Sequence, residues 1–362
     1  MEGKIQLFTQ SFIMWRDVKY LIAYIAPLAA YLGIYLQGFW SFGSIYIGFV
    51  LIPLLEFFTP QSAENVSPEE EPLRAKSYFF DFLLYLNIPI LYGLLLYYFN
   101  TLATGGLATY EIVGMTFSVG LVVGTIGINV AHELGHRSSW YEQWMSKALL
   151  LSALYTHFFI EHNRGHHKNV ATDEDPASAR LGENLYAFWW RSVSGSYRHA
   201  WKLEKERLEK LGQPVWGWNN EMVRFTAFQL LYLLAVGLVW GWYMIGYALA
   251  IAVVGFLLLE SVNYVEHYGL RRRKMPNGHY ERVSPRHSWN SDHELGRIFL
   301  YELTRHSDHH YKATRKYQVL RHFNDSPQLP IGYPAAILLS LAPPAWFKVM
   351  NERARAVCEV AG

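Results

Sequence analysis

The sequence predicts an all-α integral membrane protein with six transmembrane helices and a cytoplasmic helical cap. Hydrophobic residues make up 51% of the 362 positions and charged residues 17%, whereas soluble proteins usually carry about 25% charged residues. Lysine and arginine are also absent from three long stretches, at positions 20–73, 77–136 and 225–270. A helix needs about 20 mostly apolar residues to cross the hydrocarbon layer, so each stretch is long enough for two spans.

Polar or glycine-containing breaks divide each stretch in two. Gln37-Gly38 interrupts the first stretch, residues 100–109 interrupt the second, and Gly241 and Gly246 lie near the middle of the third. We therefore expect one domain over residues 1–362. Its spans are expected at residues 20–36, 39–58, 78–99, 110–131, 225–244 and 245–265, and its cap at residues 132–224 and 267–362.

The charge distribution predicts the orientation. The three short connections at one end of the spans contain no lysine or arginine, and all 32 such residues fall elsewhere. Because positive residues are retained on the cytoplasmic side, both termini and both long polar segments are expected there. A soluble protein with buried helices would not explain this exclusion of charge.

Two global features exclude other classes of protein. A formal net charge of +2 gives no support for nucleic-acid binding. The single cysteine, Cys358, excludes an internal disulfide, a cysteine-rich metal site and a rubredoxin within this chain.

Eight of the 15 histidines fall into three clusters with helical spacing. Positions i, i+3 and i+4 share one face of a helix, so each cluster can direct two or three imidazoles at one point. The clusters are His132 and His136; His162, His166 and His167; and His306, His309 and His310. His267 closes the sixth span at the same membrane depth as His132. Eight or nine imidazoles are too many for one ion and suit two, and imidazole binds iron, zinc, copper or nickel.

One competing motif overlaps the first cluster. Residues 132–136 read H-E-L-G-H, which fits the H-E-x-x-H pattern of zinc metalloproteases with Glu133 as general base. At a membrane, this motif would indicate an intramembrane protease. A zinc site needs only three protein ligands, so this hypothesis leaves most of the clustered histidines unexplained.

The clusters resemble the histidine boxes of the membrane desaturase and hydroxylase superfamily. The sequence around the clusters resembles that of the alkane 1-monooxygenases, and the resemblance extends over essentially the whole chain. The four matching segments are N-V-A-H-E-L-G-H-R at 129–137, F-F-I-E-H-N-R-G-H-H at 158–167, N-Y-V-E-H-Y-G-L at 263–270 and L-T-R-H-S-D-H-H at 303–310. The H-Y-G element is the part that separates alkane hydroxylases from desaturases.

This resemblance implies terminal hydroxylation of medium-chain n-alkanes to 1-alkanols in a bacterial inner membrane. It implies two non-haem iron ions, O2, and two electrons from a rubredoxin that an NADH-dependent reductase reduces. It implies no catalytic side chain beyond the metal ligands. A fatty-acid desaturase or an alkylbenzene methyl hydroxylase remains the alternative. The implied ligands are His132, His136, His162, His166, His167, His267, His306, His309 and His310.

Neutral imidazoles leave the charge of two metal ions uncompensated, so nearby carboxylates are expected to offset it and to orient the ligands. Four candidates adjoin a ligand, and Glu260 lies within the sixth span on the face of His267. The candidates are Glu133, Glu161, Glu260, Glu266 and Asp308. For Glu260, a structural hydrogen bond within the bundle is an equal alternative.

The basic run Arg271-Arg272-Arg273-Lys274 follows His267 directly. It is a candidate docking patch for an acidic electron donor, and anchoring at the membrane surface is the alternative. An apolar channel for the alkane is expected between the spans, with Gly48 and Gly120 as candidate wall positions.

Overall fold

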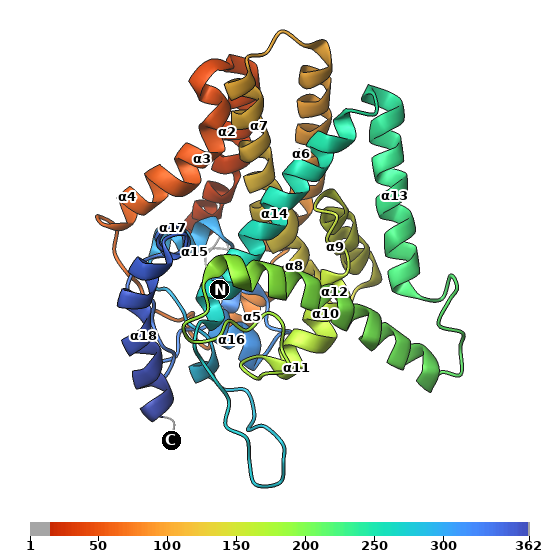
Figure 1. Ribbon diagram of the computed structural model, residues 1–362. Coiled ribbons are helices and arrows are strands. Elements are labelled where there is room, and N and C mark those ends of the chain that lie inside the picture. The colour runs from red at the N-terminus through yellow and green to blue at the C-terminus, as the bar shows by residue number, and fades with distance from the viewer. Residues whose placement is uncertain (1–14, 361–362) are drawn as a thin grey trace, which may run out of the picture.

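The computed structural model describes residues 15–360 and is all-helical (Figure 1). Within that range, extended pairing is limited to isolated bridges such as that between Lys274 and Tyr280. Six helices are long and apolar enough to cross a membrane, which confirms the predicted all-α membrane fold. They cover Trp15–Leu36, Gly38–Glu56, Glu71–Thr104, Thr109–Gly135, Glu221–Trp240 and Met244–His267.

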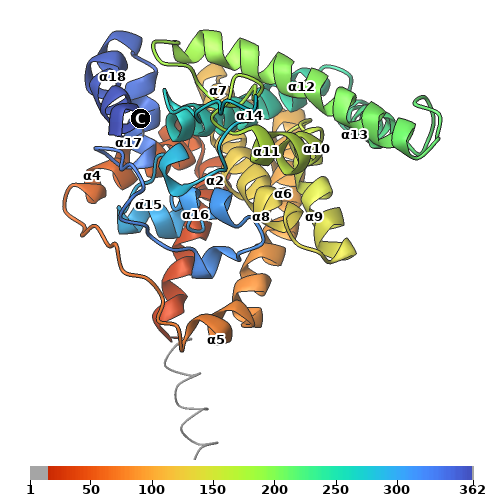
Figure 2. The same cartoon turned by 90° about the horizontal axis from the view of Figure 1, so that it is seen from below.

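These six spans contain α2 (Ile25–Leu36), α3 (Gly43–Tyr46), α4 (Ile52–Glu56), α6 (Tyr78–Thr104), α7 (Thr109–Val122), α8 (Asn129–Gly135), α13 (Glu221–Trp240) and α14 (Met244–His267). Most of them rise together on one side of the molecule, and the remaining elements gather at their lower end in Figure 1. The view from below shows those elements spread across the end of the bundle (Figure 2).

The span that contains α7 and α8 forms the centre of the bundle. Within it, 78% of the most apolar window is buried, whereas the corresponding share for α13 is 22%. Small residues let α14 approach α7 closely. A Cβ atom added to Gly120 would lie 2.5 Å from the Cβ of Val254. Gly120 therefore belongs to a helix–helix contact.

Local sequence explains where the spans end. Gly105 and Gly241 follow the last residues of α6 and α13 with φ values of 72° and 102°, which suit glycine at a helix C-terminus. Asn220 begins α13, and its side-chain oxygen accepts hydrogen bonds from the backbone N–H groups of Met222 and Val223. Such an N-cap satisfies donors that the helix itself leaves free.

Two polar segments cover the lower end of the bundle. The first holds α9 (Trp140–Ser152), α10 (Phe158–Glu161), α11 (His167–Asn169) and the long α12 (Leu185–Lys210). The second holds α15 (Glu294–Phe299), α16 (His306–Tyr311), α17 (Tyr333–Ser340) and α18 (Pro343–Val360). A short helix, α5 (Glu71–Ala75), forms the lower end of the third span, before α6. Packing of these segments against α8 and the end of α14 positions the histidines.

Candidate metal centre

The nine histidines meet at the lower end of the central helices in two adjoining groups. The members of each group offer ring nitrogens that all lie within 4.8 Å of one another. The five-histidine group contains His132, His136, His162, His167 and His309. The four-histidine group contains His166, His267, His306 and His310.

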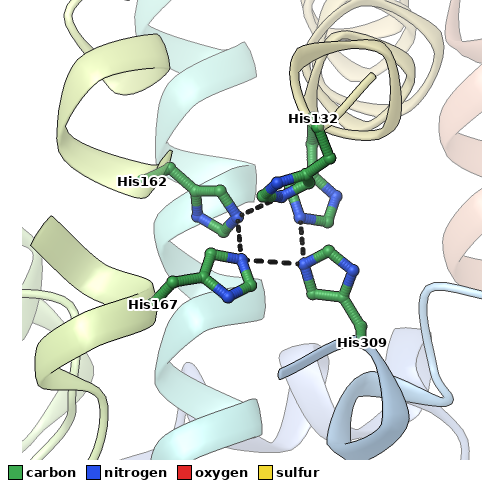
Figure 3. A group of neighbouring side chains, drawn as sticks. His132, His162, His167 and His309 are labelled. Carbon is green, nitrogen blue, oxygen red and sulfur yellow. Dashed lines mark hydrogen bonds between the residues drawn. The ribbon is translucent and has the colours of Figure 1, made fainter. Parts of the chain in front are cut away.

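Four members of the five-histidine group point toward one another from three parts of the chain (Figure 3). The Nε2 atom of His309 lies 2.8 Å from that of His132 and 3.0 Å from that of His167. The Nε2 atom of His162 lies 3.0 Å from those of His167 and His136. Two imidazoles at right angles on one ion, each about 2.1 Å from it, would place their nitrogens about 3.0 Å apart. The observed spacing therefore suits a shared ion.

The four-histidine group is more deeply buried. The Nε2 atom of His306 lies 3.2 Å from that of His267 and 2.9 Å from that of His310. His267 is completely buried, and its Nδ1 lies 3.4 Å from the backbone oxygen of His287. This contact directs Nε2 of His267 toward the other members.

A π-helical turn distributes the second cluster between the two groups. Residues His162–His166 form this turn, in which the helix is wound more loosely than an α-helix. His162 and His167 therefore share a face, while His166 points into the other group. In α16, His306 and His310 share a face at α-helical spacing, and His309 joins the five-histidine group. Helical spacing predicted the clusters but not this division.

The surroundings keep most of these imidazoles neutral, which is the form that binds metals. Burial lowers the pKa of His162, His167, His309 and His310 well below the usual value, and the neighbouring histidines add to the effect. Burial likewise lowers the pKa of His136 to about 3.

The exception is His166, which has a carboxylate partner that the sequence analysis missed. Burial alone would lower its pKa, but the adjacent Asp175 carboxylate raises it overall. The Nδ1 atom of His166 lies 2.9 Å from Oδ2 of Asp175, which also accepts a 2.5 Å hydrogen bond from Ser178. Asp175 lies in the loop between α11 and α12, nine positions beyond His166, so no helical spacing marks it.

Of the five carboxylates proposed from the sequence, Glu266 directly contacts a clustered histidine. Its Oε2 lies 3.2 Å from Nε2 of His306, and its Oε1 is buried without a hydrogen-bond partner among the described residues. Asp308 is fully buried and instead holds Arg321, with contacts of 2.9 and 3.1 Å to the backbone N and Nη2. Asp308 therefore fixes α16 to the following loop.

The other three carboxylates bind protein groups outside the two histidine groups. Oε1 of Glu133 lies 2.6 Å from Nη2 of Arg137, and that of Glu161 lies 3.2 Å from Nδ1 of His199. Glu260 accepts hydrogen bonds of 2.7 Å from Tyr155 and 2.5 Å from Ser192, which both lie in the segment that covers the lower end of the bundle. Glu260 thus binds protein hydroxyl groups and contacts no clustered histidine among the described hydrogen bonds.

The donor set fits metal ions. Nε2 of His166 is buried without a partner among the described residues, while Nδ1 is occupied by Asp175. The free nitrogen faces the three other members of its group. Two groups of converging imidazoles, one of them with carboxylate contacts, are a suitable set of ligands for two divalent transition metals.

An apolar cavity ends at these histidines. His132, His162 and His306 line its polar end. Its other walls come from the second span, α7, the π-helical turn Val123–Ile128, α10, α14, α15 and α17, and include Gly48, Phe49, Leu121, Gly124, Leu258, Val262 and Ile337. Gly48 thus lines the cavity, whereas Gly120, the other candidate wall position, does not.

Comparisons with known proteins agree with this arrangement. A sequence model of the fatty acid desaturase family matches residues 108–335, which include all nine histidines. Alkane 1-monooxygenase 2 of Pseudomonas aeruginosa is 42% identical over 91% of this chain and 90% of its own length. Alkane 1-monooxygenase of Pseudomonas putida is 40% identical over 89% of this chain and 81% of its own length.

A more distant relative acts on aromatic compounds. The xylene/toluene monooxygenase hydroxylase component XylM of Pseudomonas putida is 28% identical over 92% of this chain and 87% of its own length. The relatives named as alkane 1-monooxygenases are 37–42% identical. These names identify an oxidoreductase, so the zinc protease hypothesis is wrong.

Proposed function

The chain belongs to the alkane 1-monooxygenase family, within the wider fatty acid desaturase family, and on this premise we propose that it hydroxylates medium-chain n-alkanes to 1-alkanols. The observation that carries the proposal is the apolar cavity that ends at His132, His162 and His306. An alkane offers no polar group, so an apolar cavity of this kind is the site it requires.

We propose that the two histidine groups each hold one iron ion, with all nine histidines as ligands. Bound iron would supply the oxidising chemistry of O2, which an unactivated C–H bond requires and which a side-chain acid or base cannot provide. Asp175 would hold the ring of His166, and Glu266 would offset positive charge beside His306.

The walls of the cavity explain terminal attack. Phe49, Leu121 and Leu258 exclude water and leave the alkane to enter lengthwise between the helices. Its terminal carbon would then be held beside the histidines, and the rate gain would come from positioning. A branched or bulky hydrocarbon would fit this arrangement less well.

Oxidation of an alkylbenzene methyl group is the second candidate, because the xylene/toluene enzyme is a relative. Both reactions oxidise a terminal methyl group and would use the same metal centre. The higher identity of the alkane enzymes supports n-alkanes as the main substrate. Desaturation of a fatty acid is the third candidate, and the identity of the product separates it from the first two.

The proposed electron donor is a rubredoxin, itself reduced by an NADH-dependent reductase. His136 and His167 are the partly exposed members of the five-histidine group, so electrons have the shortest route to the metals there. The basic run at 271–274 lies beside this point, because Nη1 of Arg272 donates a 2.9 Å hydrogen bond to the backbone oxygen of Lys168. This position favours docking of an acidic partner.

Charge reversal tests this docking surface. Lys274→Glu changes an exposed residue of the run, and Lys205→Glu is the control because Lys205 is an exposed lysine on α12. We expect the apparent KM for rubredoxin to rise in the first variant alone, most clearly at low salt. An unchanged KM in Lys274→Glu would argue for simple anchoring at the membrane.

We also propose that the metal centre and both termini face the cytoplasm of a bacterial inner membrane. The connections at the far end of the spans, residues 37, 105–108 and 241–243, contain no lysine or arginine. The positive-inside rule supports this orientation. Labelling of cysteines introduced at Gly106 and at Lys312 in intact cells would test it.

One assay tests the proposed reaction. Purified protein is reconstituted with iron, rubredoxin, reductase and NADH, supplied with n-octane or with toluene, and the products are identified. We expect 1-octanol as the main product under O2. An alkene, or oxidation of toluene alone, would contradict alkane hydroxylation.

A further inference from the structure

A small second cavity adjoins the metal centre and shares His132 and Leu303 with the wall of the apolar cavity. His132 and His309 of the five-histidine group line one side of it. Tyr301 and Tyr317 line another side, with Leu303 and Leu320 between them. Two oxidisable phenol rings are therefore the aromatic neighbours of this cavity.

A third tyrosine extends this pair toward the surface. The ring centroids of Tyr301 and Tyr317 are 5.4 Å apart, and those of Tyr317 and Tyr20 are 5.8 Å apart. Tyr20 and Tyr317 are both almost completely buried. Tyr317 and Tyr20 thus connect the cavity at the metal centre with the lower end of the first span.

The hydroxyl groups differ in their hydrogen-bond acceptors. Tyr20 donates a 2.6 Å hydrogen bond to Oε1 of Glu302. Tyr317 donates a 3.3 Å hydrogen bond to the backbone oxygen of Phe80, and the hydroxyl of Tyr301 accepts one from Asn87. A phenol that loses an electron must also release its proton to a base. Of the three, Tyr20 has the carboxylate that can take it.

Tyr20, at the outer end of the row of three tyrosines, lines a polar pocket. Tyr20 and Glu302 form part of its wall, together with Arg297 and Arg305 and the exposed Glu64 and Asn65. Arg297 Nε lies 2.8 Å from Oε2 of Glu302. Burial alone would raise the pKa of this carboxyl group, but the charges of Arg297 and Arg305 lower it overall. A small polar molecule can approach Tyr20 here, and none of the residues that line this pocket lines the apolar cavity.

The backbone between the inner cavity and the polar pocket adopts an unfavourable conformation. Tyr301 and Glu302 are consecutive non-glycine residues with φ values of 52° and 59°. Such left-handed conformations persist where the surroundings impose them, and they cluster at functional sites. This turn places Tyr301 at the inner cavity and Glu302 at the outer pocket.

We propose that Tyr20 and Tyr317 form a path that carries electrons to the metal centre. This path would reduce the centre when it becomes oxidised without a bound alkane, before the histidine ligands are damaged. This inference rests on the proposed function. One electron would pass from Tyr20 to the oxidised centre through the ring of Tyr317, and Tyr317 keeps its own hydroxyl proton because Tyr20 resupplies the electron in the same step. The proton of the Tyr20 hydroxyl moves to Glu302, so the step leaves a neutral tyrosyl radical, a protonated carboxyl group and a centre with one more electron.

A small thiol in the polar pocket then restores Tyr20. The thiol gives a hydrogen atom to the phenoxyl oxygen and leaves as a thiyl radical, and Glu302 returns its proton to water. Each such transfer delivers one electron from a thiol to the metal centre. Two transfers therefore supply the two electrons that oxidation of the substrate would otherwise provide.

Freeze-quench electron paramagnetic resonance tests this path. Iron-loaded protein is reduced, mixed with O2 in the absence of alkane and frozen, with and without ring-deuterated tyrosine. We expect a tyrosyl radical that narrows on deuteration, disappears when n-octane is present, and is largely lost in Tyr20→Phe. Tyr317→Phe keeps an aromatic ring at this position but should lower the yield, because a benzene ring is much harder to oxidise than a phenol.

Tyr98→Phe is the matched control. Tyr98 is fully buried in α6 and lies 18 residues beyond Phe80, about 27 Å along the helix. We expect the radical in this variant to match the wild type. In Tyr20→Phe, early octane turnover should be retained, and the number of turnovers before inactivation should fall when octane is scarce.

Two results would overturn the path. They are the absence of a tyrosyl radical in wild-type protein that hydroxylates octane normally, and a radical of undiminished yield in both Tyr20→Phe and Tyr317→Phe. Because octane hydroxylation is measured in the same preparations, loss of the proposed function itself would be recognised separately.

Discussion

The Nε2 atoms of His162 and His167 lie 3.0 Å apart across a π-helical turn, whereas His166, between them in sequence, belongs to the other histidine group. One short segment thus contributes to both groups and fixes their separation. A regular α-helix would have placed His162 and His166 on the same face instead. The local winding of the helix therefore decides how ligands are shared.

His267→Ala should remove one of the two irons. The four-histidine group would keep three members, and the loss would be accompanied by loss of alkane hydroxylation. Metal content per chain, measured after desalting, checks this expectation. His279→Ala is the control, because His279 is exposed and belongs to neither group. Two irons and full turnover in His267→Ala would show that His267 is not a ligand.

Asp175→Asn should weaken metal binding at the four-histidine group. The substitution removes the negative charge that orients His166, and loss of such a partner typically costs about 10- to 100-fold in metal affinity. Competition with a chelator measures the change. Asp173→Asn is the control, because the side chain of Asp173 is 77% exposed in the same loop. Equal iron retention in both variants would contradict a role for Asp175.

The membrane fold and the ligand clusters could be predicted from the sequence for physical reasons. Charge is excluded from lipid-facing helices, so the absence of lysine and arginine over 20–73, 77–136 and 225–270 marks the spans directly. Imidazoles at helical spacing share a face, so three clusters on one side of the membrane indicate a common site.

The division of the ligands and part of their support could not be predicted. The π-helical turn at His162–His166 depends on packing that sequence spacing does not encode. Asp175 reaches His166 through the fold of a loop. For Glu260, helical spacing suggested too much. The residue lies on the face of α14 that carries His267, which suggested a role at the metal centre, but its carboxylate accepts hydrogen bonds from Tyr155 and Ser192.

Gly48→Leu should shift the enzyme toward shorter alkanes. The new side chain would begin 3.1 Å from Cδ1 of Leu121 and would fill part of the cavity. Each buried methylene is worth about 0.8 kcal/mol, so excluding two of them should lower the preference for octane over hexane roughly 15-fold.

Competition between octane and hexane checks this effect. Gly246→Leu is the control, because a Cβ atom at Gly246 meets nothing within 4 Å. An unchanged chain-length profile in Gly48→Leu would show that this part of the cavity does not hold the substrate.

His157 should make the protein less stable in acid. Its ring is buried between Tyr155 and Tyr197, and burial lowers its pKa from 6.5 to about 3. Below pH 6.5 the unfolded chain binds a proton that the folded chain does not, so unfolding becomes easier as the pH falls. Between pH 7.5 and 5.5 this residue should cost about 1.4 kcal/mol.

His157→Phe keeps a buried ring that does not titrate, so its thermal midpoint should fall less between these pH values. The comparison needs the iron-loaded protein in one detergent, with His279→Phe as a control for an exposed histidine. A pH dependence identical to that of the wild type in His157→Phe would disprove the assignment.

The most direct test of the account is the position and identity of the bound metals. Anomalous diffraction or scattering at the iron edge, combined with the metal content of purified protein, measures both. The account predicts two irons per chain, one within the five-histidine group and one within the four-histidine group. A single ion, or zinc in place of iron in protein that hydroxylates octane, would contradict it.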